Sequence, residues 1–230
     1  MTNDKIALVT GANKGIGYEI ARQLTDLGWT VVAAARDKSR DVALDVTDPA
    51  SIAAAANEVG ATYGRLDVLV NNAGISGGMR SQTPGAVELD AIREVFETNV
   101  FGVVAVTEAF LPLLRKANGG ARIVNLTSSV GSLTRMSDPS WYFTHIPGSL
   151  AYAPSKTALN QVTVQYAKQL APEGIGVYAA DPGPCDTDFT RGKFKVTRTA
   201  AEGAEIAVRL ATGEDMPSGN YVNAEGPVPW

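Results

Sequence analysis

The stretch that decides the fold is TGANKGIG, residues 10 to 17, which directly follows the apolar run KIALVT at residues 5 to 10. Its glycines, Gly11, Gly15 and Gly17, suit a turn from a strand into a helix. One permits the tight turn, one lets the backbone approach a pyrophosphate, and one lets the helix pack closely on the strand. A helix that begins here presents free N–H groups and its positive dipole end to an anion. The motif therefore predicts a dinucleotide-binding unit, since its place between a strand and a helix argues against a glycine-rich turn without a ligand.

The rest of the chain alternates between runs typical of strands and runs typical of helices. Several of the predicted strands are continuously apolar, as expected for strands covered on both faces. The predicted strands are Lys5–Thr10, Thr30–Ala35, Asp67–Asn71, Ala121–Leu126, Gly176–Ala180 and Asn220–Asn223. The predicted helices are Gly15–Leu27, Ala50–Tyr63, Glu88–Lys116, Ala153–Leu170 and Ala200–Ala211. This alternation predicts parallel crossover units in a doubly wound α/β sheet, and residues 1–230 show no internal repeat or linker, so we expect one domain.

Composition excludes several kinds of site. The 230 residues carry 20 Lys and Arg against 24 Asp and Glu, a net charge of −4, with no basic block to indicate a nucleic-acid surface. Cys185 is the only cysteine and His145 the only histidine, which argues against an intramolecular disulfide and against cysteine-rich or histidine-rich metal sites. The first residues do not resemble a secretion signal, and no apolar run approaches the length of a membrane span. We therefore expect a metal-free, reduced, cytoplasmic protein without a membrane partner.

The residues at the end of the second predicted strand indicate which dinucleotide binds. An NAD enzyme usually places an acid there for the ribose 2′-hydroxyl, whereas an NADP enzyme offers arginine. This chain has Arg36 followed by Asp37, and Lys14 in the glycine loop adds a second cation. Two cations suit a 2′-phosphate, which predicts NADP (NADPH). NAD is the alternative if Asp37 meets the ribose, but Asp37 also fits the role of a local turn cap.

Five motifs occur in a characteristic order along nearly the whole chain. They are TGANKGIG, then Asn71-Asn72-Ala73-Gly74, then Ser128, then Tyr152-x-x-x-Lys156, then Pro182-Gly183. Together they resemble the short-chain dehydrogenase/reductase family, and VTGANKGIGYEIARQL is most similar to its NADPH-dependent carbonyl reductase branch. The resemblance implies a Rossmann-type three-layer fold with a central, mostly parallel sheet of about seven strands.

The chemistry of a carbonyl reduction explains the catalytic candidates. Hydride transfer to a carbonyl needs a proton donor at the developing alkoxide, and a tyrosine with a pKa near ~10 needs tuning to exchange protons at neutral pH. The spacing of four places Lys156 on the face of Tyr152, where a cation favours the phenolate. Ser128 would donate to the substrate oxygen; the family pattern through NLTSSVG selects it over Ser129. Taken singly, Lys156 fits a solvated helix lysine and Ser128 a turn residue.

The remaining site residues are implied by the resemblance. Asn99, in FETNVFG, matches an asparagine that completes a proton relay through water; taken alone it also fits a kink within a helix. Lys156 matches a residue that also binds ribose hydroxyls, and Asn71 more simply stabilises the sheet. The predicted cofactor-binding residues are Gly11, Asn13, Lys14, Gly15, Ile16, Gly17, Arg36, Asp45, Val46, Asn72, Ala73, Gly74, Tyr152, Lys156, Pro182, Gly183 and Thr187.

The chain departs from the family pattern between Ser128 and Tyr152, which lie 24 positions apart. The extra residues, 135–147, contain Trp141, Tyr142 and Phe143. Two interpretations compete: these rings roof an apolar substrate pocket, or, as we favour, they pack on the fold and cover a face that relatives use for dimerising. Residues 186–199 are expected to form a mobile substrate loop.

We expect an NADP(H)-dependent oxidoreductase that reduces a ketone, aldehyde or quinone to the alcohol. Tyr152 would be the acid/base, Lys156 its tuner and ribose clamp, Ser128 the donor to the substrate oxygen, and Asn99 the relay anchor. The alternatives are an NAD-dependent alcohol dehydrogenase of the same family and a non-catalytic dinucleotide sensor. The expected partner is a small-molecule carbonyl or alcohol, and the chain would act as a monomer or homo-oligomer.

Overall fold

An eight-stranded sheet forms the centre of the protein, in the order β3-β2-β1-β4-β5-β6-β7-β8. The computed structural model describes residues 5–37, 39–78, 80–145, 147–190, 196–213 and 216–230. Neighbouring strands pair in parallel except β7 and β8, which are antiparallel. The strands are β1 Ile6–Thr10, β2 Thr30–Ala35, β3 Val42–Ala43, β4 Val68–Asn71, β5 Arg122–Leu126, β6 Gly176–Ala180, β7 Tyr221–Asn223 and β8 Gly226–Pro227.

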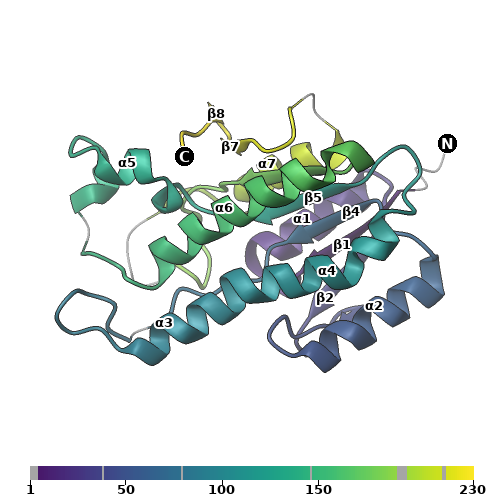
Figure 1. Ribbon diagram of the computed structural model, residues 1–230, viewed down its shortest axis with the longest axis horizontal. Coiled ribbons are helices and arrows are strands. Elements are labelled where there is room, and N and C mark those ends of the chain that lie inside the picture. Colours follow the sequence, from purple (N-terminus) through teal and green to yellow (C-terminus); the bar gives the residue numbers. More distant parts are fainter. Residues whose placement is uncertain (1–4, 38, 79, 146, 191–195, 214–215) are drawn as a thin grey trace.

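Helices cover both faces of this sheet, which makes three layers (Figure 1). The α-helices are α1 Gly15–Asp26, α2 Pro49–Tyr63, α3 Leu89–Phe96, α4 Gly102–Leu114, α5 Leu133–Ser137, α6 Tyr152–Leu170 and α7 Ala200–Thr212. In β1, Ile6 and Leu8 pack with α2, α4 and α6, whereas Ala7 and Val9 pack with α1 and α7. Successive side chains point to opposite faces of a strand, so a strand with two covered faces must be apolar throughout.

Local signals in the sequence explain where individual helices begin. Asp48 accepts a hydrogen bond from the N–H of Ala50 at 2.9 Å and is followed by Pro49, which needs no N–H partner in the first turn. Thr199 and Glu202 form a reciprocal capping box at the start of α7. Pro154 lies in the first turn of α6, which begins at Tyr152 as its position predicts.

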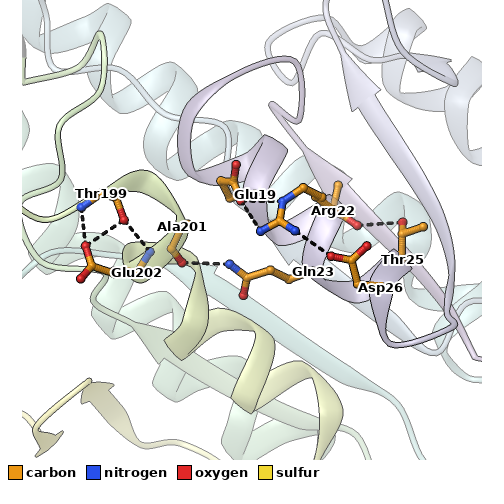
Figure 2. Close-up of polar contacts among 9 residues, drawn as sticks. Glu19, Arg22, Gln23, Thr25, Asp26, Thr199, Ala201 and Glu202 are labelled. Carbon is orange, nitrogen blue, oxygen red and sulfur yellow. Dashed lines mark hydrogen bonds and ion pairs between the residues drawn. The ribbon is translucent and has the colours of Figure 1, made fainter.

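Helices α1 and α7 lie side by side on one face of the sheet (Figure 2). The side chain of Gln23 in α1 donates a 2.9 Å hydrogen bond to the main-chain oxygen of Ala201 in α7. On the exposed side of α1, Arg22 pairs with Glu19 and Asp26 one turn away in each direction. This contact fixes the two helices that flank the glycine loop and the segment after β6.

The sequence-based prediction differs from the structure in two places. We predicted about seven strands, and the sheet has eight in the described part of the chain. Strands β3 and β8 are only two residues long, too short to show an apolar pattern in the sequence. The predicted helix Glu88–Lys116 is interrupted by a π-helical turn at Glu97–Phe101, between α3 and α4. Such turns within α-helices often occur at functional sites.

The stretch Leu89–Leu114 has the length and apolar composition of a membrane span, contrary to the expectation that no run approaches one. Its most apolar window has a mean hydropathy of 1.3, and 56% of that window is buried inside the protein. Within it, Val106, Phe110 and Leu114 belong to the core cluster under the sheet. The core of a soluble domain is sufficient to explain this apolar helix.

The direction of the chain reverses between the central strands β1 and β4. From β1 the chain builds outward through β2 and β3, and then returns to add β4, β5 and β6 on the other side. In open α/β sheets this switch point leaves a crevice at the carboxyl ends of the strands, where ligands bind. The predicted site motifs all follow the carboxyl ends of strands in this region.

Candidate active site

A cleft of about 1090 Å³ lies at the carboxyl ends of the central strands. Every predicted cofactor-binding residue lines it, as does Ser128, whereas Asn99 does not. The structure therefore brings together predicted residues from seven parts of the chain, from Gly11 to Thr187, around one cleft.

The glycine loop adopts the backbone conformation that its sequence predicts. Gly11 and Gly15 have φ angles of 63° and 58°, a region that side chains disfavour. A Cβ at Gly17 would lie 2.5 Å from the main-chain oxygen of Gly11, so only glycine fits there. No side chain caps the N-terminus of α1, so its first N–H groups are available to an anion. These features fit the pyrophosphate of a dinucleotide.

Two polar side chains hold this loop against the end of β4. The Oγ1 atom of Thr10 accepts hydrogen bonds from the N–H groups of Asn72 and Ala73, both at 3.0 Å. The amide of Asn72 donates back to the main-chain oxygens of Thr10 at 2.8 Å and Gly11 at 3.2 Å. Asn71, by contrast, points into the sheet and donates to the Oδ1 atom of Asn125 at 2.9 Å, which confirms its predicted structural role.

Two cations line the cleft, Arg36 directly after β2 and Lys14 in the glycine loop. Arg36 is exposed on the cleft wall, and Lys14 pairs with Asp188 at 2.8 Å. Asp37 is bonded to the main-chain N–H and hydroxyl of Ser39, as predicted for a local cap, and is not among the residues that line the cleft. Asp45 also closes a local turn, because its Oδ1 atom accepts from the N–H of Thr47 at 2.9 Å.

Ser128 and Tyr152 lie close together in the cleft. Ser128 lies in the turn after β5 and Tyr152 at the start of α6; both line the cleft, and Ser128 is close enough to lower the pKa of the tyrosine. The neighbouring Ser129 points elsewhere, into a buried network with Asp181 and Arg135. The geometry thus separates the two serines in the way that the sequence pattern predicts, with Ser128 facing the tyrosine.

Lys156 lies one turn beyond Tyr152 on the same helix. The lysine is 5% exposed, its Nζ atom is 5.8 Å from the centroid of the Tyr152 ring, and it donates to the main-chain oxygen of Leu126 at 2.8 Å. Burial lowers the pKa of Lys156 to about 8. Lys156 is therefore a buried amine held at the end of β5, not the solvated helix lysine that its spacing alone would allow.

The tyrosine does not show the tuning that we predicted. Burial raises the pKa of Tyr152 well above its usual range, the nearby hydroxyl of Ser128 lowers it by less, and the carboxylate of Asp181 raises it further. Desolvation therefore outweighs any effect of Lys156, since removing a phenolate from water is costly. In this structure the phenol of Tyr152 is therefore protonated at neutral pH.

Asn99 lies one layer behind the cleft wall, in the π-helical turn. It is fully buried, and its side chain bonds both main-chain groups of Ile75, accepting at 2.8 Å and donating at 2.9 Å. The same amide donates to Ser155 of α6 at 3.0 Å. These bonds join the segment after β4 to the helix that carries Tyr152. The side-chain amide of Asn99 therefore has a structural role in this arrangement.

The segment after β6 forms the opposite wall. Gly183 has a φ angle of 69°, and Pro182, Gly183 and Thr187 line the cleft. Cys185, at 2% exposure, packs beneath Gly203 of α7, and burial raises the pKa of its thiol to about 11. Of the predicted substrate loop, residues 191–195 lie outside the described residues.

Two aromatic side chains contribute to the substrate end. The ring of Phe189 lies 5.3 Å from that of Tyr152, and Phe143 also lines the cleft. In the inserted segment, the rings of Trp141, Tyr142 and Phe143 pack on one another, and Tyr142 is 59% exposed. One ring of the insertion, Phe143, therefore reaches the cleft, while Trp141 and Tyr142 pack with it; the covering of a dimerisation face stays a prediction.

Sequence reasoning missed three residues of the site. Gln82 accepts from the N–H of Tyr152 at 3.1 Å and donates to the main-chain oxygen of Ser76 at 2.6 Å. Tyr221 of β7 donates to the main-chain oxygen of Ser128 at 2.6 Å, and Asp181 lies beside Ser129. Only Asp181 carried a signal, as an acid directly before the Pro-Gly motif.

Comparisons with known proteins agree with this arrangement. A family profile described as short chain dehydrogenase matches residues 5–198. A short-chain dehydrogenase, anuI, of Penicillium roqueforti is 38% identical over 227 residues, covering 90% of this chain and 88% of that protein. A (+)-neomenthol dehydrogenase of Capsicum annuum is 32% identical, covering 96% of each chain. The crystal structure of an NADPH-bound carbonyl reductase from chicken fatty liver superposes with a TM-score of 0.86 at 32% identity, covering 99% of each chain.

Proposed function

Because the chain belongs to the short-chain dehydrogenase/reductase family of oxidoreductases, which act on alcohol and carbonyl groups with NAD(P), we propose that it reduces ketones, aldehydes or quinones to alcohols with NADPH. The observation that carries the proposal is that Ser128 and Tyr152, the candidates for binding the substrate oxygen, line the same cleft as Arg36 and Lys14, the candidates for binding a 2′-phosphate. When bound, a nicotinamide dinucleotide supplies the hydride.

The charges at the adenine end support NADP rather than NAD. Arg36 and Lys14 both line the cleft, and a guanidinium together with an ammonium suits a 2′-phosphate. The NAD alternative needs Asp37 at the ribose, but Asp37 bonds Ser39 instead. A 2′-phosphate would compete with Asp188 for Lys14, since both are anions.

The state of Tyr152 supports reduction as the favoured direction. A carbonyl that accepts hydride becomes an alkoxide and needs a proton, and burial keeps the phenol of Tyr152 protonated. Ser128 would donate a second hydrogen bond to the same oxygen and hold the substrate in place. Lys156 would hold the ribose hydroxyls with the proton that it carries below about pH 8.

The walls of the cleft favour an apolar carbonyl compound. Phe143, Phe189, Ile75 and Val130 line the substrate end. A substrate with an apolar body would bury its surface against these side chains while its oxygen meets Ser128 and Tyr152. The proposal further includes a cytoplasmic location, one domain over residues 1–230, and action as a monomer or homo-oligomer without nucleic-acid or membrane partners.

NADPH oxidation in the presence of cyclohexanone, benzaldehyde and menadione tests the activity. We expect turnover of at least one of these neutral carbonyls, with a kcat/KM for NADPH above that for NADH. Tight NADPH binding without turnover of any carbonyl would instead favour the dinucleotide sensor. Such a sensor has no need for Ser128, Tyr152 and Lys156 in one place.

A further inference from the structure

A buried carboxylate stands between the two turns that meet at the active site. Asp181 directly follows β6 and is 2% exposed. Its Oδ1 atom accepts a hydrogen bond from the N–H of Gly183 at 2.9 Å, and its Oδ2 atom accepts from the hydroxyl of Ser129. An ionised carboxylate accepts at both oxygens, so these bonds match the charged form. Asp181 also lines the cleft, yet the proposed reaction gives it no task.

The inserted segment supplies the countercharge. Arg135 of α5 donates from Nη1 to the Oγ atom of Ser129 at 3.0 Å, and its guanidinium lies 5.8 Å from the centroid of the Trp141 ring. A hydroxyl has one proton, so Ser129 donates to Asp181 while it accepts from Arg135. Burying a carboxylate without a nearby cation costs free energy of folding. Here the guanidinium of Arg135 is linked to the carboxylate of Asp181 through the hydroxyl of Ser129.

The two turns that Asp181 joins both carry predicted site residues. Ser129 directly follows Ser128, the predicted donor to the substrate oxygen. Gly183 belongs to the turn predicted to meet the nicotinamide amide, and its φ angle of 69° is one that glycine adopts freely, so the hydrogen bond to Asp181 selects it among many accessible conformations. One side chain therefore sets the position of the substrate-side turn relative to the cofactor-side turn.

On the basis of the oxidoreductase function proposed above, we propose that Asp181 is a positioning residue, and that the inserted segment 135–147 acts on the reaction through it. Arg135 orients Ser129, and Ser129 and Gly183 together hold the carboxylate of Asp181. Asp181 in turn fixes the Ser128 turn against the Gly183 turn. The insertion thus reaches the reacting groups through hydrogen bonds, in addition to the contact that Phe143 makes with the cleft.

The charge of Asp181 gives this role a measurable signature. The titratable groups near Tyr152 are Lys156 on the same helix, Asp181 after β6 and Tyr221 in β7. Arg135 in α5 acts on Tyr221 and on Tyr142 of the inserted segment. After the larger effect of burial, Asp181 raises the pKa of Tyr152 and of Tyr221. Removing the charge of Asp181 should lower the pKa of Tyr152, and removing that of Arg135 should raise it.

The first measurement compares two ligands. The cofactor NADPH reaches the Gly183 turn, whereas adenosine 2′,5′-bisphosphate would fill only the end near Arg36. For Asp181→Asn we expect NADPH to bind about tenfold more weakly, the loss of one hydrogen bond to a charged group. The bisphosphate should bind within about twofold of the unmodified chain. Equal weakening of both ligands, or of neither, would overturn the positioning role.

The second measurement is the pH dependence of kcat for whichever of cyclohexanone, benzaldehyde and menadione is reduced fastest. The alkaline limb follows the first group to lose its proton, and Lys156, with a pKa of about 8, precedes Tyr152. Removing a nearby negative charge lowers the pKa of either group, and removing a positive charge raises it. We therefore expect Asp181→Asn to move the limb to lower pH by on the order of one unit, Arg135→Met to move it to higher pH, and Arg135→Lys to restore it. Arg115→Met removes the same charge at a distant surface pair with Glu173 and should leave the limb in place.

The outcomes separate the two proposals. Shifts of the same sign in Asp181→Asn and Arg135→Met, or no shift in either, would overturn the role of the network. If Asp181→Asn does not fold, the Arg135→Met and Arg135→Lys pair decides, because Arg135 lies near the surface. An unmodified chain that binds NADPH but reduces no carbonyl contradicts the proposed function, and the ligand comparison then still tests the positioning role.

Discussion

The Nζ atom of Lys156 donates a hydrogen bond to the main-chain oxygen of Leu126, the last residue of β5, at 2.8 Å. This bond joins the helix that carries Tyr152 to the strand that leads into Ser128. It also holds an amine in a nearly water-free position, where burial lowers the pKa of Lys156 to about 8. Lys156 thus links the elements that carry Ser128 and Tyr152, but the burial of its amine lowers the free energy of unfolding.

That cost predicts a pH-dependent stability for Lys156→Met. The folded pKa of about 8 lies below the ordinary value of 10.5, so the folded state pays a penalty below about pH 8 that is relieved as the pH rises toward 10.5. The shift corresponds to about 3 kcal/mol, and the lost hydrogen bond offsets about 1 kcal/mol of the gain. We expect the variant to melt a few degrees higher near neutral pH, with a difference that shrinks at higher pH.

Melting curves at about pH 6.5 and about pH 9.5 check this expectation. Lys168→Met, at an exposed position of the same helix, is the matched control and should show no such pH dependence. A difference in melting temperature between Lys156→Met and the unmodified chain that grows with pH would contradict the buried-amine interpretation.

Tyr152→Phe should remove the proton donor and little else. The ring remains to pack against Phe189, so NADPH should bind with an affinity within about twofold of the unmodified chain. We expect kcat to fall by about 10²–10⁴-fold, the usual contribution of a general acid. Tyr142→Phe, at an exposed tyrosine of the inserted segment, is the control and should keep its rate. A Tyr152→Phe rate within a few-fold of normal would exclude the assigned role.

Arg36→Asp should change the preference between the two cofactors. A carboxylate at this end of the cleft repels a 2′-phosphate and accepts from a ribose hydroxyl. We expect the ratio of kcat/KM for NADPH to that for NADH to fall by about 10–100-fold, as for the loss of a hydrogen bond between charged groups. Arg40→Asp is the control, because Arg40 stacks on Tyr18 and is not among the cleft-lining residues. An unchanged ratio in Arg36→Asp would refute the phosphate site.

Asp188→Asn should free Lys14 for the cofactor. Both partners of this ion pair are largely exposed, so breaking it should leave the melting temperature within about one degree. We expect NADPH to bind about two- to fivefold more tightly, with NADH unaffected, because only the 2′-phosphate competes for Lys14. Titration of each cofactor by fluorescence measures both affinities. Equal changes for NADPH and NADH would show that Lys14 does not meet the phosphate.

Two glycine substitutions should have opposite effects. A Cβ at Gly131 would lie 2.8 Å from the main-chain carbon of Lys156, so Gly131→Ala must push α6 away and should destabilise the fold by about 1–3 kcal/mol. A Cβ at Gly60, inside α2, would make only an ordinary contact of 3.5 Å with Leu113. Gly60→Ala should therefore raise stability by about 0.5–1 kcal/mol through helix propensity. Chemical denaturation measures both changes, and a stable Gly131→Ala variant would contradict the close approach.

Local patterns predicted the parts of the fold that depend on local physics. The glycine loop, the six longer strands and the start of α6 near Pro154 follow from backbone sterics and apolar runs. Strands β3 and β8 were missed because two residues cannot carry a pattern, and their pairing depends on distant neighbours. A kink at Asn99 was considered as an alternative to a catalytic role, but the π-helical turn there and its bonds to Ile75 and Ser155 depend on residues distant in the sequence.

The candidate site divides in the same way. Residues that belong to a motif, such as Gly11 and Ser128, lie where the sequence predicts, on the cleft wall. The prediction that the pKa of Tyr152 is lowered was wrong in direction. The spacing in the sequence reveals the nearby lysine but not how deeply the tyrosine is buried. Gln82 and Tyr221 could not be predicted, since each reaches the site from a distant part of the chain through hydrogen bonds that no local pattern reveals.

The burial of Cys185 has a practical consequence for inhibitor chemistry. With a thiol pKa of about 11, only about one molecule in 10⁴ carries the reactive thiolate at neutral pH. The residue lines the cleft but is packed beneath α7, and it is the only cysteine in the chain. Alkylating agents and mild peroxide should therefore leave the enzyme active, and covalent ligands for this cleft would need a different anchor.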